Sequence, residues 1–159
     1  KSDKPITIHM HSVGGEWSDG MAIYDAISMS RSYITIIAYG QAESMSSIIF
    51  QAADKRLITA NTYFMSHYGS TGANGEYLSV QNWVKYEKRI CDIMIDIYAQ
   101  SCIGGAYFKE KYGSNPDIEK VKTYLLRKLK SGDWYITADE AVYYGFADEV
   151  INTWQKLKS

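Results

Sequence analysis

The sequence predicts an α/β protein, because strand-like and helix-like patterns alternate along its 159 residues. Two apolar β-runs, at residues 5–12 and 33–39, are each followed by glycine and then by a segment with helical spacing. Hydrophobic residues make up 46% of the chain, which excludes a disordered protein. At roughly 100–200 residues per domain, this length predicts one domain over residues 1–159.

Each expected element follows from its local pattern. Alternating or continuous apolar runs predict strands, and apolar residues three and four apart predict helices. Glycines are expected to end elements, Gly40 a strand and Gly132 a helix, and polar residues are expected to cap helices. In chain order the elements are a strand at 5–12, a helix from Ser18 or Asp19 to about 29, a strand at 33–39, a helix from Ser44, a strand at 62–66, a helix at 78–100, a helix capped by Asn115 and ending at Gly132, a helix at 138–144 and a strand at 147–151.

Charge and hydropathy exclude several classes of protein. The chain has 17 Lys and Arg against 18 Asp and Glu, without the basic excess of a nucleic-acid binder. No apolar run approaches the 18 or so residues of a membrane span. Residues 1–4 are polar with no signal-peptide core behind them, and the missing initiator Met indicates a fragment, a processed form or only the ordered part of a chain. Cys91 and Cys102 fit no disulfide or zinc pattern, so we expect reduced thiols, a packed core position for Cys91 and a cytoplasmic protein.

The three histidines limit where acid–base chemistry can occur. His9 and His11 share one face of a strand, but no carboxylate or cysteine pattern completes a metal site, and we expect none. His67 ends a strand and precedes a glycine-rich stretch where a ligand can approach. It is therefore a candidate general base, although a lone histidine is more often a packed or surface residue.

Ser44 is the candidate nucleophile, because it lies where a buried strand ends and a helix begins. Unpaired N–H groups and the helix dipole favour an oxyanion there. Ser44 could equally be a simple N-cap, as could Ser46 or Ser47, and the chain has no GxSxG motif. Residues 14–15, a Gly-Gly pair before a helix, form either an anion-binding turn or only a turn.

The order of these segments resembles the family of ClpP, the serine peptidase of the Clp protease. Four segments carry the resemblance: Ser-Val-Gly-Gly at 12–15 followed by 20–26, Gly-Gln-Ala-Glu-Ser-Met-Ser at 40–46, Tyr-Phe-Met-Ser-His at 63–67, and residues 140–148. Together they cover most of the chain, from about residue 5 to residue 151. The resemblance implies a ClpP/crotonase-like fold of repeated β-β-α units.

The resemblance also implies roles for single residues. Ser44 would attack the peptide carbonyl, His67 would take the proton of Ser44, and the N–H groups of Gly15 and Met45 would bind the oxyanion. The substrate would lie along Gly14 and the stretch that begins with Thr71 and Gly72. No metal or organic cofactor is implied.

The third catalytic residue does not follow from the family's pattern. Counting back from residue 140 without gaps places the family's aspartate on Leu129, which the helical spacing assigns to the core. Asp133 is the nearest carboxylate and our candidate, with Asp139 and Asp148 as alternatives.

The family also implies partners. Its subunits form heptameric rings that stack as a tetradecamer around a chamber, and an AAA+ unfoldase (a Clp ATPase) feeds in unfolded polypeptide. The helix at 78–100 would interdigitate between rings, burying its apolar stripe. By this resemblance, we expect residues 1–159 to lack the family's N-terminal segment, which contacts the unfoldase.

Several alternatives remain open. Glu43 replaces a small residue beside the nucleophile, and the third catalytic residue is displaced from its position in the family. Both departures favour a catalytically silent ring subunit. Divergent bacteriophage proteins of the family share such departures from its motif pattern. A phage head-maturation protease is therefore another alternative. An acyl-CoA hydratase or isomerase of the same fold is the alternative from another enzyme class.

Overall fold

Strands and helices alternate through most of residues 3–151, which the computed structural model describes. The α/β class is confirmed. The ends of the predicted domain, residues 1–2 and 152–159, lie outside the described residues. The elements are β1 Ile6–Ser12, α1 Trp17–Ser28, β2 Ile34–Glu43, α2 Met45–Phe50, β3 Lys55–Thr59, β4 Tyr63–Ser66, α3 Tyr77–Cys102, α4 Ala106–Tyr112, α5 Ile118–Lys130, β5 Trp134–Ile136, α6 Ala138–Tyr144 and β6 Glu149–Ile151.

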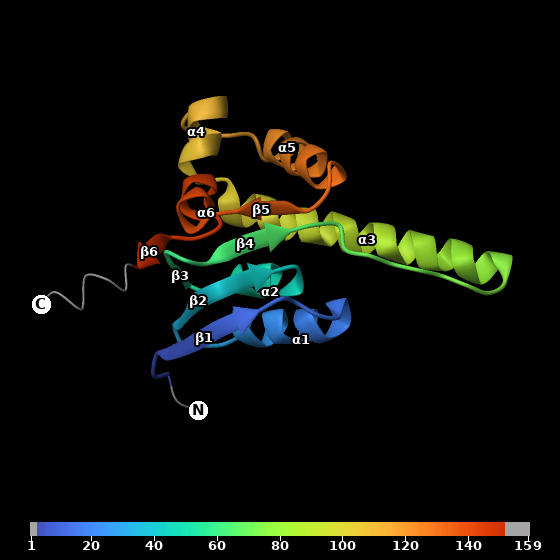
Figure 1. The fold of residues 1–159 in the computed structure, drawn as a ribbon, viewed down its shortest axis with the longest axis horizontal. Coiled ribbons are helices and arrows are strands. Elements are labelled where there is room, and N and C mark those ends of the chain that lie inside the picture. The colour runs from blue at the N-terminus through green and yellow to red at the C-terminus, as the bar shows by residue number, and fades with distance from the viewer. Residues whose placement is uncertain (1–2, 152–159) are drawn as a thin grey trace, which may run out of the picture.

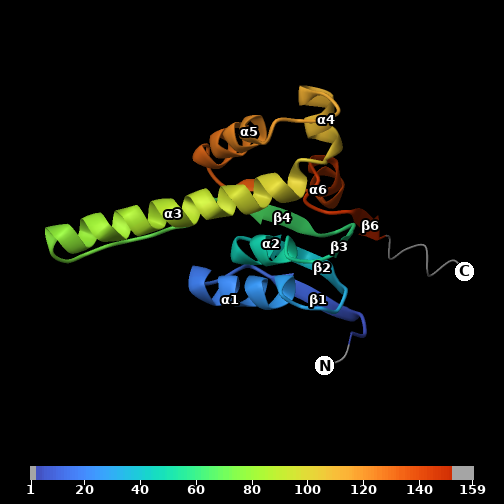
Figure 2. The same cartoon turned by 180° about the vertical axis from the view of Figure 1, so that it is seen from behind.

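The strands form one sheet in the order β5-β4-β2-β3-β6, with β1 also paired to β2. All pairs are parallel except β4 with β5. Figure 1 shows the strands stacked edge to edge, and Figure 2 shows α1 and α2 against one face of the sheet. The segment β3–β4–α3 has the expected β-β-α order.

Strand β2 changes neighbours at Gly40. Along one edge, its first half pairs with β3 and its last three residues pair with β4, whereas β1 pairs with β2 as far as Ala42. The register to β1 shifts between Met10 and Ser12, where Gly40 has a φ of 62°. The expectation that Gly40 ends the strand is therefore wrong, because this glycine forms an irregularity inside β2. As a result, β2 carries the chain on to Glu43, next to the end of β4.

Two predicted helix caps are also wrong. Glu16 is the N-cap of α1 and makes no side-chain cap bond, so Ser18 and Asp19 lie inside the helix. Asp117, rather than Asn115, caps α5, and its side chain accepts a hydrogen bond from the backbone N–H of Glu119. The short elements β3, α4 and β5 were not predicted.

An aromatic cluster joins α3 and the connection between α6 and β6 to strand β4. The rings of Phe64 and Phe146 stack with centroids 4.9 Å apart, and Tyr98 packs edge-on against Phe146 at 5.6 Å. All three side chains are buried. Leu129 is also buried, which confirms its assignment to the core.

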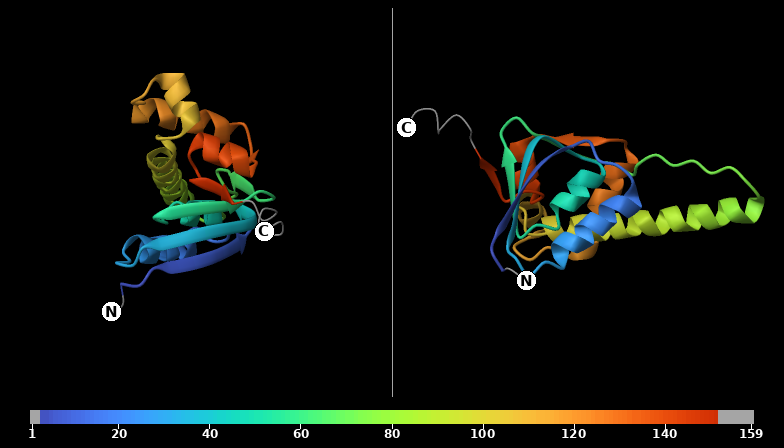
Figure 3. Two further views of the ribbon diagram at one scale, coloured as in Figure 1. Left: turned by 90° about the vertical axis from the view of Figure 1, so that its left-hand side faces the viewer. Right: turned by 90° about the horizontal axis from the view of Figure 1, so that it is seen from below.

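Helix α3 packs against the sheet through its C-terminal half alone. Met94 and Tyr98 are buried, whereas Trp83 is 41% and Val84 61% exposed. Figures 1 and 3 show the N-terminal half projecting from the body, with the β4–α3 connection running alongside it. The burial of this stripe in an oligomer stays a prediction. No helix within the described residues has the length and apolar character needed to span a membrane.

Candidate active site

Ser44 lies at a sharp turn between β2 and α2. Its φ of 52° and ψ of −126° make it the one non-glycine residue with positive φ in the described chain. Such a conformation costs about 1–3 kcal/mol and persists where neighbouring structure enforces it. Here the N–H of Ser44 donates to the carbonyl of Met65 on β4 at 2.9 Å, and its carbonyl accepts from the N–H of Ser47 at 3.0 Å. The strand-to-helix turn thus forms without a GxSxG sequence.

The three serines of this turn differ in what their hydroxyls contact. Ser46 Oγ accepts from the N–H of Glu43 and lies 2.7 Å from the Glu43 carbonyl. Ser47 Oγ bonds to the carbonyl of Ser44 and to the hydroxyl of Tyr98, each at 2.6 Å. Ser44 makes no side-chain cap bond. Its hydroxyl is therefore free of the helix terminus.

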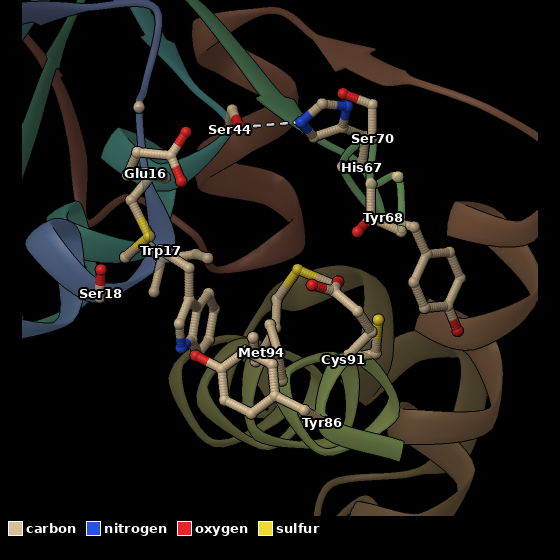
Figure 4. A pocket seen from close by; sticks show the side chains of 18 of the residues that line it. Glu16, Trp17, Ser18, Ser44, His67, Tyr68, Ser70, Tyr86, Cys91 and Met94 are labelled. Atoms are coloured by element: carbon tan, nitrogen blue, oxygen red, sulfur yellow. Dashed lines mark hydrogen bonds between the residues drawn. The ribbon is translucent and has the colours of Figure 1, made fainter. Parts of the chain in front are cut away.

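The pairing of β4 with β5 brings a histidine and an aspartate together. Ser66 pairs with Trp134 in this antiparallel register, and the next positions outward are His67 and Asp133. His67 Nδ1 lies 3.2 Å from Asp133 Oδ1, and His67 Nε2 lies 2.8 Å from Ser44 Oγ. Figure 4 shows this second contact as a dashed line. Asp133, His67 and Ser44 thus form one continuous chain of hydrogen bonds.

This chain has the geometry needed for general-base chemistry. If Nδ1–H donates to Asp133, the opposite nitrogen of His67 is free to accept the proton of the Ser44 hydroxyl. The His67 side chain is 25% exposed and that of Asp133 is 54% exposed. The pair is therefore open to water on the Asp133 side, so its electrostatic coupling is weaker than in a fully buried triad.

The glycine turn after β1 lies directly against Ser44. Gly14 has a φ of 102°, and a Cβ at this position would lie 2.7 Å from Ser44 Cβ and 2.9 Å from Met45 N. A side chain is therefore excluded by both conformation and space. Within the described residues, neither the N–H of Gly15 nor that of Met45 donates a hydrogen bond. Both amides remain candidates to bind an oxyanion.

A cavity of about 700 Å³ opens beside Ser44 and His67. Thr71 and Gly72 lie in its wall, and Thr71 Oγ1 accepts a hydrogen bond from Trp83 Nε1 at 2.9 Å. Gly14 packs behind Ser44 and does not line the cavity. Figure 4 shows several side chains of the cavity wall pointing into the cavity. Sequence reasoning missed the following lining residues from α1 and α3: Glu16, Trp17, Tyr86, Glu87, Cys91 and Tyr98.

Glu43 takes no part in the cavity wall. Its side chain is buried and accepts a hydrogen bond from Gln41 Nε2 on the same strand at 3.2 Å. The residue that favoured a silent subunit is therefore held in the sheet, outside the lining of the cavity.

Both cysteines are free thiols. Cys102 is buried, but Cys91 is half-buried in the cavity wall, so its predicted core position is wrong. Burial raises the pKa of the Cys91 thiol, and the negative charges of Glu87 and Asp92 raise it further. Cys91 is accordingly a protonated thiol near neutral pH.

The other two histidines lie away from the cavity. His9 Nδ1 contacts the hydroxyl of Tyr39 at 2.8 Å, and His11 Nδ1 contacts the Tyr39 carbonyl at 2.9 Å. The described part of the chain contains no group of three or more potential metal ligands.

The two alternative aspartates have no contact with His67. Asp139 lies in the first turn of α6. Asp148 binds Arg56, with Oδ1 2.6 Å from Arg56 Nη2 and Oδ2 accepting from the Arg56 N–H at 2.7 Å. Burial alone would raise the pKa of Asp148, but the hydrogen bonds and charge of Arg56 outweigh it and lower that pKa.

The Asp148→Asn substitution is expected to reduce the free energy of unfolding at pH 7 by about 1 kcal/mol, a value that allows for partial exposure of the pair. The pKa of Asp148 is lower in the folded state than in the unfolded state. Its contribution is therefore present above the unfolded pKa of about 4 and is lost as the pH falls through the folded pKa. Urea unfolding of both proteins at pH 7 and pH 3 measures this. The control is Asp25→Asn, which removes an exposed aspartate of α1 that forms no ion pair with any other described residue. A difference that is the same at both pH values would contradict the assignment.

The fold and site together define an α/β protein with a serine–histidine–aspartate chain beside a cavity. A model of the Clp protease family matches residues 1–154. The chain is 29% identical over 152 residues to an ATP-dependent Clp protease proteolytic subunit of Deinococcus radiodurans, covering 94% of this chain and 66% of that protein. It is 30% identical over 163 aligned positions to a protein of the same name from Ligilactobacillus salivarius, covering 99% of this chain and 72% of that protein. The chain thus spans about two thirds of the length of these relatives, and it belongs to the Clp protease family.

Proposed function

We propose that this protein is a serine endopeptidase that cleaves unfolded polypeptides or short peptides, with Ser44 as nucleophile and His67 as base. The observation that carries the proposal is the 2.8 Å contact between Ser44 Oγ and His67 Nε2 at the mouth of a cavity. Family membership supports the same conclusion, since both relatives are named as proteolytic subunits.

In the proposed reaction, Ser44 Oγ attacks the carbonyl carbon of the scissile peptide bond while His67 Nε2 takes the hydroxyl proton. The N–H groups of Gly15 and Met45 stabilise the negative charge that forms on the carbonyl oxygen. His67 then gives its proton to the leaving amine, which breaks the C–N bond and leaves an acyl ester on Ser44. Water, deprotonated by His67, hydrolyses this ester and restores the hydroxyl.

We also propose that the active form is a ring oligomer, heptameric and stacked in pairs, that encloses the cavity within a chamber. The two relatives are named as subunits of an ATP-dependent protease, which supports this assembly and a separate AAA+ ATPase that delivers the polypeptide. The apolar side chains exposed on the N-terminal half of α3 support burial against another subunit. A cytoplasmic location is consistent with the two free thiols.

Labelling with a fluorophosphonate probe tests the proposed chemistry independently of the natural substrate. The probe reacts with a serine that an adjacent base activates, so we expect modification of Ser44 in the native protein and none after denaturation. Mass spectrometry of the modified peptide identifies the residue. A folded oligomer in which Ser44 stays unmodified would contradict the proposal and favour a silent ring subunit.

A further inference from the structure

One side of helix α3 forms a wall of the cavity. Its cavity-lining residues recur every three or four positions, which places them on one face of the helix. They are Trp83, Tyr86, Glu87, Ile90, Cys91, Met94 and Tyr98. Glu87 is half-buried and lines the cavity, whereas Lys88 and Arg89, which follow it in the sequence, are exposed and do not line it. The carboxylate of Glu87 is thus on the wall of the cavity rather than on the solvent-facing side of α3.

The charge of Glu87 is not compensated by a neighbouring cation. Within the described chain, the side chain of Glu87 takes part in no ion pair and no hydrogen bond, and the cavity wall contains no lysine or arginine. Glu16 adds a second carboxylate to the same lining, and His67 is its single basic residue. The negative charge of Glu87 is felt within the cavity, since it is among the causes that raise the pKa of the Cys91 thiol. A cationic group that enters the cavity is therefore attracted to Glu87, and it does not have to displace another cation from Glu87.

The part of the cavity between Ser44 and Glu87 is largely apolar. Tyr98 bonds to Ser47, one helical turn after Ser44, so the Tyr98 end of α3 lies near the nucleophile. Farther along the same face, Cys91 lies close enough to Tyr68, the residue after His67, to raise the pKa of Tyr68, and Glu87 is one helical turn from Cys91. The apolar lining residues here are Met45, Ile48, Ile90 and Met94. A side chain that suits this path has an aliphatic stem and a positive end.

We propose that Glu87 makes the cavity selective for lysine or arginine in the substrate residue whose carbonyl carbon Ser44 attacks. This inference rests on the proposed function, because it assigns the substrate preference of the same site. The stem of such a residue packs on the apolar wall, and its ammonium or guanidinium pairs with the Glu87 carboxylate. A neutral side chain of equal length leaves Glu87 unpaired, and an acidic one is repelled by it.

The test compares two fluorogenic substrates, acetyl-Ala-Ala-Lys-aminomethylcoumarin and the same peptide with norleucine in place of lysine. Norleucine keeps the aliphatic stem and lacks the ammonium group, so the ratio of the two kcat/KM values isolates the charge. We expect lysine to be preferred by on the order of tenfold. The Glu87→Gln substitution removes this preference, and Glu87→Lys reverses it. The matched control is Glu76→Gln, which removes the same charge from the N-cap of α3, outside the cavity, and keeps the preference.

A preference for norleucine, or a ratio that Glu87→Gln leaves unchanged, would overturn the inference. A second measurement keeps the inference testable if no peptide is hydrolysed. In this measurement, the two peptides are prepared as uncleavable amides and bound to the Ser44→Ala protein. Binding is monitored by the fluorescence of Trp17 and Trp83, which lie in the cavity wall. Tighter binding of the lysine peptide that is lost in the Ser44→Ala, Glu87→Gln double variant supports the selectivity even without turnover. Equal binding of both peptides overturns it. Absence of both hydrolysis and fluorophosphonate labelling, by contrast, counts against the proposed function.

Discussion

Replacing Ser44 with alanine is expected to lower kcat for peptide hydrolysis by on the order of 10⁶-fold, to the background left by binding and oxyanion stabilisation. The substitution removes the one hydroxyl in contact with His67 Nε2. It keeps the Cβ that packs against Gly14, and an alanine meets the same backbone strain as the serine. Fold and assembly should therefore be unchanged, which circular dichroism and light scattering can check beside the turnover of a fluorogenic peptide.

The matched control is Ser70→Ala. Ser70 lies in the wall of the same cavity, but the hydrogen bonds of His67 go to Ser44 and Asp133 and not to Ser70. This variant should retain activity within a few-fold of the unmodified protein. Hydrolysis that survives in Ser44→Ala at the original rate would remove Ser44 as the nucleophile, whatever the control shows.

Local patterns in the sequence were sufficient to predict the elements that carry Ser44 and His67. A continuous apolar run predicts β2, and helical spacing after Ser44 predicts α2. Both are confirmed. Local patterns do not predict the role of Gly40, because a glycine can either end a strand or lie at an irregularity within it. The choice depends on the pairing of β2 with β1 and β4, which no local pattern records.

The position of Asp133 depends on a contact between distant parts of the chain. It follows from the antiparallel pairing of β4 with β5, a strand of three residues that is too short to show a periodic pattern. Counting back from residue 140 leads to Leu129, and Asp133 is a candidate only as the nearest carboxylate. The pairing of β5 with β4 is what brings Asp133 to His67. Its catalytic role stays a prediction.

The cavity wall illustrates a different limit. Helical spacing predicts that Trp83, Ile90 and Met94 share one face of α3, but it does not predict what covers that face. In the structure these residues line the cavity. The same limit explains Cys91, which was assigned to the core from its apolar neighbours and lies instead at the edge of the cavity.

Replacing Asp133 with asparagine is expected to lower kcat by about a hundredfold. Loss of the aspartate in a buried triad costs about 10⁴, because the amide favours the wrong tautomer of the histidine. The Asp133 side chain is 54% exposed and 3.2 Å from His67 Nδ1, so water can replace part of its effect, and the expected loss is smaller. KM should stay within a few-fold, because Asp133 does not line the cavity. Steady-state kinetics on one fluorogenic peptide separates the two constants.

Two further variants decide whether Asp133 acts by orienting His67. Asp139→Asn removes a carboxylate from the first turn of α6, without contact to His67, and should leave kcat unchanged. Asp133→Glu keeps the charge on a longer side chain and should recover part of the lost rate, because the exposed site has room for it. A kcat that is equally high in the unmodified protein and in Asp133→Asn would mean that solvent alone orients His67. In that case the catalytic unit would be the Ser44–His67 pair, and the departure of this chain from the family's pattern at Leu129 would be a true loss of the third residue.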